Sequence, residues 1–264
     1  SSTGGLNNGT AFNLSRIRLG AATSQLNSVV GTNLFNGTIS EVLFYSTLLT
    51  PSQIQQIEGY LAWKWGLQSS LPTSHPFTQA NYFFNNTRPV TRYFNPPDIE
   101  GCQLWIDPAD STTVTTTNVG TAVTQWRDKS PVGNHMTTAA GFLAPTYDIS
   151  SRSLQFTAVA NTSATVLGNT NLSTAITSNS ITVFGVYNRI TQASGVTTYQ
   201  RFISAAPASG SDNTSVTGFN INSTSVLSPG NNLGITYERN TAYLHTTATT
   251  TSPFILSFVV NGTG

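Results

Sequence analysis

The chain has 264 residues, of which only 8% are charged, and its eleven basic and ten acidic side chains leave a formal net charge of +1. So sparse and balanced a charge excludes a basic patch for nucleic acid and an acidic tail. Cys102 is the single cysteine, which excludes an internal disulfide framework and a zinc site built on paired cysteines. Because Cys102 lies directly before an apolar strand, we expect its thiol to be buried.

The N-terminal part of the chain predicts a loop followed by two strands. Residues 1–10 are mostly Ser, Gly, Asn and Thr, a composition typical of loops. In residues 11–21, Arg16 and Arg18 alternate with apolar side chains, which predicts a strand with one polar face. A β-rich run over residues 38–45 predicts the second strand.

A helix is predicted to begin directly after Thr50. Thr50 is a suitable N-cap, Pro51 suits the first helical position, and Gln53 completes a capping box. Gly66 stands where a left-handed C-terminal cap is expected. Apolar side chains follow at spacings of three and four along one face: Ile54, Ile57, Leu61 and Trp65. We expect this to be the chain's one real helix.

The rest of the chain predicts a linker and then an all-β region. Residues 78–101 are interrupted by prolines and rich in aromatics and Asn, so an extended Pro-rich linker is expected there. After it, short apolar runs separated by turn residues predict strands at 153–156, 181–187, 201–205, 218–221, 233–237, 242–245 and 254–260. Short strands without helices indicate an antiparallel sandwich.

Two groups of motifs carry a resemblance to a known family. The first group comprises Gly37, Ile39, Glu41, Leu49, Gln53, Glu58, Tyr60, Leu61, Ala62, Lys64, Trp65, Gly66, Leu71, Pro72, His75 and Pro76. In this order they resemble the C-terminal end of the concanavalin A-like, laminin-G-like domains that occur in tandem in large bacterial surface proteins and in giant-virus structural proteins. The resemblance implies an antiparallel jelly-roll sandwich.

The second group resembles the opening of the same domain. It comprises Leu104, Trp105, Ile106, Asp107, Ala109, Asp110, Trp126, Asp128, Ser130, Gly133, Asn134 and His135, with Pro131 where the family usually has Gly. The two ends of the family therefore occur in reversed order. Residues 1–77 supply the C-terminal strands and helix, residues 78–101 the linker, and residues 102–264 the N-terminal and central strands.

Three arrangements satisfy this permuted order. The two segments close on each other within one chain, or each is completed by a neighbouring copy, or the chain is one period of a longer tandem-repeat polypeptide. An incomplete sandwich exposes unpaired strand edges, which favour strand addition from another copy. Head-to-tail addition of this kind does not close and generates fibres. We therefore expect completion by a neighbouring copy or repeat.

Several side chains are candidates for a site. Asp107, Asp110 and Asp128 are expected to cap turns, with calcium binding as the functional alternative. Acid–base catalysis by these carboxylates is not expected, because the dense carboxylate motif of related glucanases is missing, and no G-x-S-x-G frames a nucleophile. Trp63 and Trp126 are candidates for stacking on a sugar, although the core is the commoner place for tryptophan. His75 is expected to be hydrogen-bonded and structural.

These observations lead to two hypotheses on function, neither of them enzymatic. The first is a structural repeat unit of an extracellular or virion-surface fibre, whose partners are copies of the same chain. The alternative is a lectin-like adhesion module that binds glycans. Sandwiches of this kind host both roles, so fold analogy does not choose between them. No stretch approaches the roughly 18 apolar residues of a membrane span, and no membrane insertion is expected.

Overall fold

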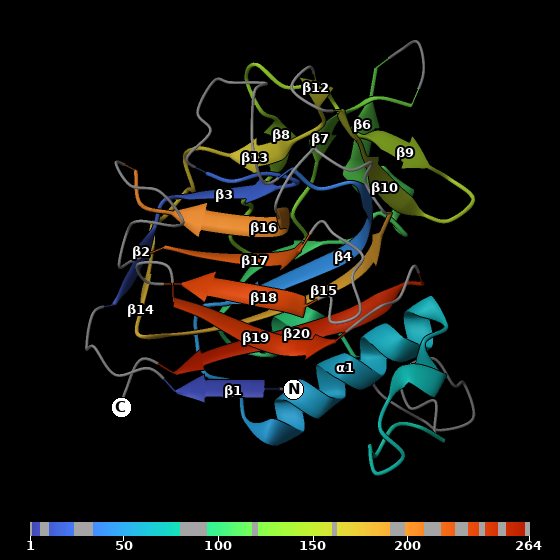
Figure 1. The fold of residues 1–264 in the computed structure, drawn as a ribbon, viewed down its shortest axis with the longest axis vertical. Helices are drawn as coiled ribbons and strands as arrows, with labels where there is room; N and C mark the ends of the chain where they lie inside the picture. Colours follow the sequence, from blue (N-terminus) through green and yellow to red (C-terminus); the bar gives the residue numbers. More distant parts are fainter. Residues whose placement is uncertain are drawn as a thin grey trace.

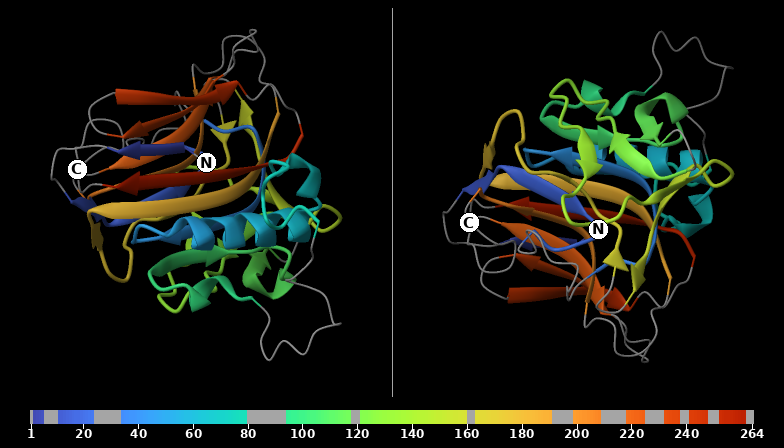
Figure 2. Two further views of the ribbon diagram at one scale, coloured as in Figure 1. Left: turned by 90° about the horizontal axis from the view of Figure 1, so that it is seen from below. Right: turned by 90° about the horizontal axis from the view of Figure 1, so that it is seen from above.

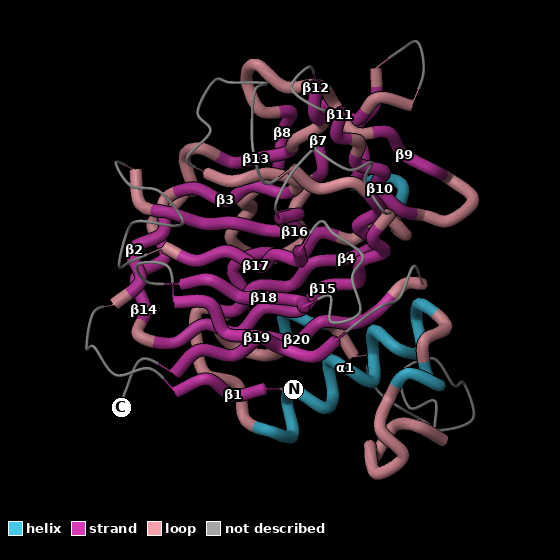
Figure 3. The backbone as a smooth tube through the Cα atoms, viewed as in Figure 1, coloured by secondary structure: helices cyan, strands magenta, loops and turns pink. Residues whose placement is uncertain are grey.

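The computed structural model describes residues 2–5, 11–23, 34–79, 94–117, 121–159, 163–190, 199–208, 218–224, 232–237, 241–247 and 252–261. Strands dominate this part of the chain, and one long helix lies beside them (Figure 3). No helix in the described ranges is long and apolar enough to cross a membrane.

The first sheet has seven strands in the order β1-β20-β15-β4-β10-β9, and β5 also pairs with β4. The strand bounds are β1 (Ser2–Gly5), β4 (Gly37–Tyr45), β5 (Cys102–Ile106), β9 (Thr146–Asp148), β10 (Ser153–Phe156), β15 (Ser180–Arg189) and β20 (Phe254–Asn261). All of these pairs are antiparallel except that of β1 with β20.

The second sheet has nine strands in the order β19-β18-β17-β16-β3-β13-β8-β7-β6. The bounds are β3 (Arg16–Leu19), β6 (Val114–Thr116), β7 (Val123–Trp126), β8 (Met136–Thr138), β13 (Leu167–Asn169), β16 (Tyr199–Ala206), β17 (Phe219–Thr224), β18 (Asn232–Tyr237) and β19 (Thr241–Thr247). Two small sheets pair β2 (Phe12–Leu14) with β14 (Ile176–Ser178) and β11 (Ala158–Val159) with β12 (Ser163–Ala164).

The two large sheets enclose the main hydrophobic core, so the predicted all-β antiparallel sandwich is confirmed (Figure 1). Val42 and Phe44 of β4 and Val183 of β15 point into this core, as do Ile203 of β16 and Phe219 of β17. The alternate residues of β4 and β15 face the other side of the first sheet. Because both of their faces are covered, these strands are buried along nearly their whole length.

Helix α1 (Pro51–Trp65) covers the outer face of the first sheet (Figure 2). The predicted capping box is confirmed, since Gln53 N donates to Thr50 Oγ1 and Thr50 N donates to Gln53 Oε1. Gly66 is left-handed with φ 69°, as expected for the C-cap. A second buried cluster forms where α1 meets the sheet, and its members include Leu43, Tyr45, Ile54, Ile57, Leu61, Trp105, Phe184 and Val186.

Three short 3-10 turns complete the described elements: η1 (Gln68–Ser70), η2 (Pro96–Asp98) and η3 (Ser111–Thr113). The turn η2 lies in the predicted extended linker, of which residues 80–93 are outside the described ranges. The C-terminal end of the predicted linker is not extended but folded against the sheet. Tyr45 Oη donates to Pro96 O at 3.0 Å, and Ile99 is buried.

The N-terminal and C-terminal segments are interleaved in both sheets. In the second sheet β3 lies between β13 and β16, and in the first β4 lies between β15 and the pair β10 and β5. In this single chain the strands of residues 1–77 thus pair with strands of residues 102–264. Supply of the same strands by a neighbouring copy stays a prediction.

The predicted polar face of β3 differs from expectation, because Arg16 and Arg18 are only 5% and 2% exposed. After the turn at Gly20 the chain folds back over its own strand. Arg18 Nη1 donates to Ala22 O at 3.3 Å, and the guanidinium lies 5.6 Å from the centre of the Phe142 ring. The alternation of arginines therefore marks a covered polar layer and not a solvent face.

Candidate functional site

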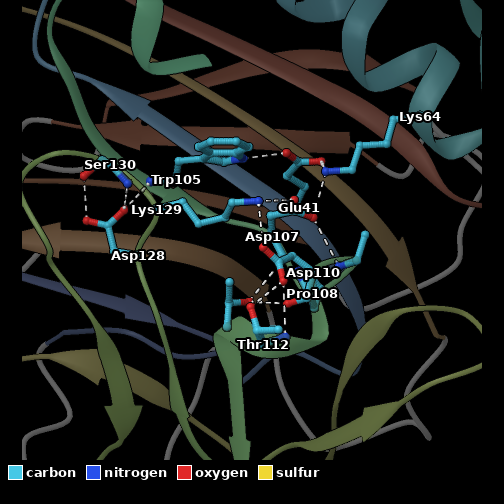
Figure 4. A network of polar contacts seen from close by, with 12 residues as sticks. Glu41, Lys64, Trp105, Asp107, Pro108, Asp110, Thr112, Asp128, Lys129 and Ser130 are labelled. Atoms are coloured by element: carbon cyan, nitrogen blue, oxygen red, sulfur yellow. Dashed lines mark hydrogen bonds and ion pairs between the residues drawn. The ribbon is translucent and has the colours of Figure 1, made fainter. Parts of the chain in front are cut away.

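The three aspartates singled out in the sequence belong to one polar network at the end of β5 (Figure 4). Asp107 directly follows β5, Asp110 caps η3, and Asp128 lies two residues after β7. Two lysines reach the first two carboxylates, Lys64 from α1 and Lys129 from the segment after β7. The network therefore joins the N-terminal segment of the chain to the C-terminal segment.

Glu41 of β4 is a fully buried member of this network. Its Oε1 accepts hydrogen bonds from Tyr60 Oη at 3.0 Å and Trp105 Nε1 at 2.8 Å. Its Oε2 accepts from Trp65 Nε1 at 2.7 Å and lies 2.9 Å from Lys64 Nζ. Burial raises the pKa of Glu41, and the positive charge of Lys64 opposes this rise only in part.

Asp107 lies between the two lysines. Its Oδ1 is 2.7 Å from Lys64 Nζ, and its Oδ2 is 3.1 Å from Lys129 Nζ, which also lies 3.2 Å from Asp110 Oδ2. Lys129 stacks on the indole of Trp105, with Nζ 4.3 Å from the ring centre. Burial alone would lower the pKa of Lys129, but the charges of Asp107 and Asp110 outweigh it and raise the pKa.

Asp128 organises the backbone around it. Its Oδ1 accepts from Trp105 N at 2.7 Å and Ser130 N at 2.8 Å, and its Oδ2 accepts from Ser130 Oγ at 2.7 Å and Asn134 N at 2.6 Å. Asp128 N in turn donates to His135 Nδ1 at 3.1 Å. The carboxylate thus ties β5 to the turn after β7.

These residues do not fit a calcium ion. Calcium takes six to eight oxygen ligands, but the carboxylates of Asp107 and Asp110 are occupied by ammonium groups. Asp128 is occupied by four N–H and O–H donors. Within the described ranges, no group of three His, Cys, Asp or Glu side chains could hold a metal ion. The turn-capping interpretation describes Asp110 and Asp128 better.

The two candidate tryptophans both pack against buried clusters, Trp126 completely and Trp63 with part of its side chain exposed. Trp126 is fully buried in the core between the sheets. Trp63 packs against the cluster under α1, and its Nε1 donates to Phe77 O at 2.8 Å. Both side chains therefore serve packing, the commoner of their two predicted roles.

A cavity of about 490 Å³ opens between α1, the segment after η1 and β20. Glu58, His75 and Ser257 provide polar groups in its lining: Ser257 Oγ donates to Glu58 Oε1 at 2.5 Å, and His75 Nε2 lies 3.3 Å from Glu58 Oε2. Its apolar lining residues are Pro51, Ile54, Leu71, Pro72, Phe254 and Ile255. Because the carboxylate stands between serine and histidine, His75 does not activate Ser257 as in a hydrolase triad.

Cys102 has the buried thiol that the sequence predicted, being 4% exposed and unpaired as a free cysteine. Burial raises the pKa of this thiol to about 12. We therefore expect Cys102 to react with a thiol reagent such as dithionitrobenzoate only after unfolding, since the thiolate is the reactive species. The absorbance change in native buffer and in guanidinium measures this, and rapid labelling of the native protein would contradict it.

Sequence reasoning missed Glu41 and Lys64 as the centre of the network. A signal was present, because Glu41 is an acidic residue at the start of the apolar run that forms the rest of β4. Lys64 gives no such signal, since a lysine in the last turn of a helix is ordinarily explained by the helix dipole. The cavity was missed as well, since its lining comes from residues about 200 positions apart.

No family model, no curated protein and no solved structure matches the chain. The fold itself defines the class of protein: in the described residues it is an antiparallel β-sandwich with one helix packed outside it. The laminin-G-like assignment continues to rest on the motif residues alone and stays a prediction.

Proposed function

We propose that the chain is a structural repeat unit of an extracellular or virion-surface fibre, in which neighbouring sandwich units share strands head to tail. The observation that carries the proposal is the interleaving of the two segments in both sheets. Neither segment builds a complete sheet, because β3 and β4 of the N-terminal segment have strands of the C-terminal segment on both sides. A copy that received these strands from a neighbour would form the same pairs.

The use of the motif residues supports a structural role. Four of these side chains form hydrogen bonds and ion pairs within the protein: Glu41, Lys64, Asp107 and Asp128. They hold the helix and the ends of two strands together across the junction of the segments. Such a network suits a unit that must keep its shape and resist pulling, and it leaves these groups bound to one another instead of to a substrate.

Disulfide trapping tests which chain supplies the strands. Asn13 of β2 and Thr177 of β14 are exposed cross-strand partners that belong to different segments. With both replaced by cysteine (Asn13→Cys, Thr177→Cys), the pair is close enough to form a disulfide. Under mild oxidation we expect a ladder of covalent multimers on a non-reducing denaturing gel, because the two cysteines lie in different copies.

A matched pair controls for random oxidation. Thr146 of β9 and Gln155 of β10 are also exposed cross-strand partners, but both lie in the C-terminal segment. The variant Thr146→Cys, Gln155→Cys should give the same bands as the unmodified protein in every arrangement, and buried Cys102 does not interfere. If the Asn13, Thr177 pair also gives only a cross-linked monomer, strand sharing is wrong.

The second candidate function is a lectin-like carbohydrate-binding module. The cavity beside α1 favours it, because its lining includes the carboxylate of Glu58 and the partly exposed ring of Phe254, and sugars bind through hydroxyl groups and an apolar face. A purely monomeric result in the trapping experiment would leave this as the better-supported function.

A further inference from the structure

The side-chain amine of Lys64 stands in contact with two carboxylates away from water. Its Nζ lies 2.7 Å from Asp107 Oδ1 and 2.9 Å from Glu41 Oε2. The exposed fractions of the three side chains are 14%, 5% and 0% for Lys64, Asp107 and Glu41. We propose that Lys64 and Asp107 join spontaneously in an intramolecular amide, an isopeptide bond between Nζ and Cγ, with Glu41 as the group that moves the protons.

The bond forms without a co-reactant. Glu41 takes one proton from the Lys64 ammonium, and the free amine attacks Cγ of Asp107. Lys129 Nζ, 3.1 Å from Asp107 Oδ2, stabilises the negative charge that gathers on that oxygen. Oδ1 then leaves as water, carrying the proton returned by Glu41 and a second proton from the attacking nitrogen. One ammonium and one carboxylate thus become one amide and one water molecule, and Glu41 ends ionised as it began.

The surroundings favour this exchange. Two charged groups held in a poorly solvated place lose the hydration that normally makes an ion pair more stable than an amide. The fold also holds the amine and the carboxyl group in contact. The reaction therefore avoids the entropic cost of bringing two separate molecules together. Burial raises the pKa of Glu41, so its carboxyl group holds the transferred proton more readily than an exposed one would.

Aromatic rings line the reacting groups and keep bulk water away from the bond. Lys64 Nζ lies 5.2 Å from the ring centre of Tyr60 and 5.5 Å from that of Trp65. The ring of Trp105 contacts Lys129, and its Nε1 donates to Glu41 Oε1. The product amide would replace an ion pair and would suffer little hydrolysis.

The bond would fasten α1 to the end of β5. It would therefore link the N-terminal segment covalently to the C-terminal segment, whether the two belong to one chain or to neighbouring copies. The bond does not depend on strand sharing, because the contact between Lys64 and Asp107 forms in either arrangement.

Mass spectrometry of the denatured wild-type protein tests the proposal directly. We expect an intact mass that is lower by one water molecule for each chain. Tryptic digestion should leave the bond after Lys64 uncut and yield a branched peptide that joins Lys64 to Asp107. Lys64→Arg and Glu41→Gln should restore the full mass, because arginine does not form this amide and glutamine does not accept the proton.

Asp110→Asn is the matched control, since it removes a carboxylate of the same network that contacts neither Lys64 nor Glu41. We expect this variant still to lack one water molecule. A wild-type protein with the full mass would overturn the proposal without reference to any variant. A branched peptide through Lys129 would equally overturn it, because it would assign the bond to the other lysine.

Discussion

Replacing Glu41 with alanine is expected to lower the free energy of unfolding by about 3–5 kcal/mol, the usual cost of removing one partner from a buried ion pair. The carboxylate of Glu41 accepts from two indoles and a phenol and faces Lys64. Without it, these buried donors keep their desolvation cost and lose their acceptor. For a domain of this size the melting temperature should fall by roughly 6–20 °C, measured by thermal unfolding.

Two variants separate this effect from a general sensitivity to mutation. Glu100 is an exposed glutamate in the turn before β5, so Glu100→Ala should leave the melting temperature nearly unchanged. Glu41→Gln keeps one oxygen acceptor but turns an amide N–H₂ toward other donors. Its decrease in melting temperature should therefore lie between those of Glu41→Ala and Glu100→Ala. A melting temperature unchanged by Glu41→Ala would mean that the network contributes nothing to stability.

The second large effect is expected for Asp128→Ala. The carboxylate of Asp128 accepts from three backbone N–H groups and one hydroxyl, and it is 7% exposed. A buried donor left without an acceptor costs about 1–3 kcal/mol, so the total loss should reach roughly 3 kcal/mol or more. Denaturant unfolding followed by tryptophan fluorescence measures it, since Trp105 reports directly on this part of β5.

Asp110 provides the comparison for Asp128. It caps η3 and pairs with Lys129, but its side chain is 36% exposed. A surface ion pair contributes about 0–1 kcal/mol, so Asp110→Ala should cost far less than Asp128→Ala. Equal losses at the two positions would show that burial of the backbone donors does not govern the effect. Asp128→Asn retains one oxygen acceptor, so its loss in free energy of unfolding should lie between those of Asp110→Ala and Asp128→Ala.

The helix was predictable because its signals are local. The capping box, the proline at the first position and the glycine at the end act within a few residues of one another. The long strands were predictable for the same reason, since apolar runs mark β15 and β20 in any context. The short strands β6, β8 and β9 were missed, as was β1 in the stretch expected to be a loop, because three or four residues are too few to show a pattern that separates a strand from a loop.

The arrangement around Glu41 was not predictable, because it depends on which strands become neighbours. The donors to Glu41 come from α1 and β5, and Trp105 lies 64 positions further along the chain. The same holds for Arg18, whose alternation with apolar residues predicted a polar face, while the structure covers that face by folding the chain back at Gly20. A sequence pattern assigns a residue to a face of a strand but does not say what lies above that face.

The interleaving of the two segments also governs the time course of folding. During synthesis β3 and β4 emerge early, yet their partners β15 and β16 emerge more than a hundred residues later, and Ser204 Oγ donates to Ala21 O across 183 positions. Neither sheet can therefore close until most of the chain has left the ribosome. Pairings between residues this far apart in sequence make folding slow. Apolar strands stay exposed and unpaired in the meantime. Until then the edges of β3 and β4 lack these partners and are open to pairing with other strands.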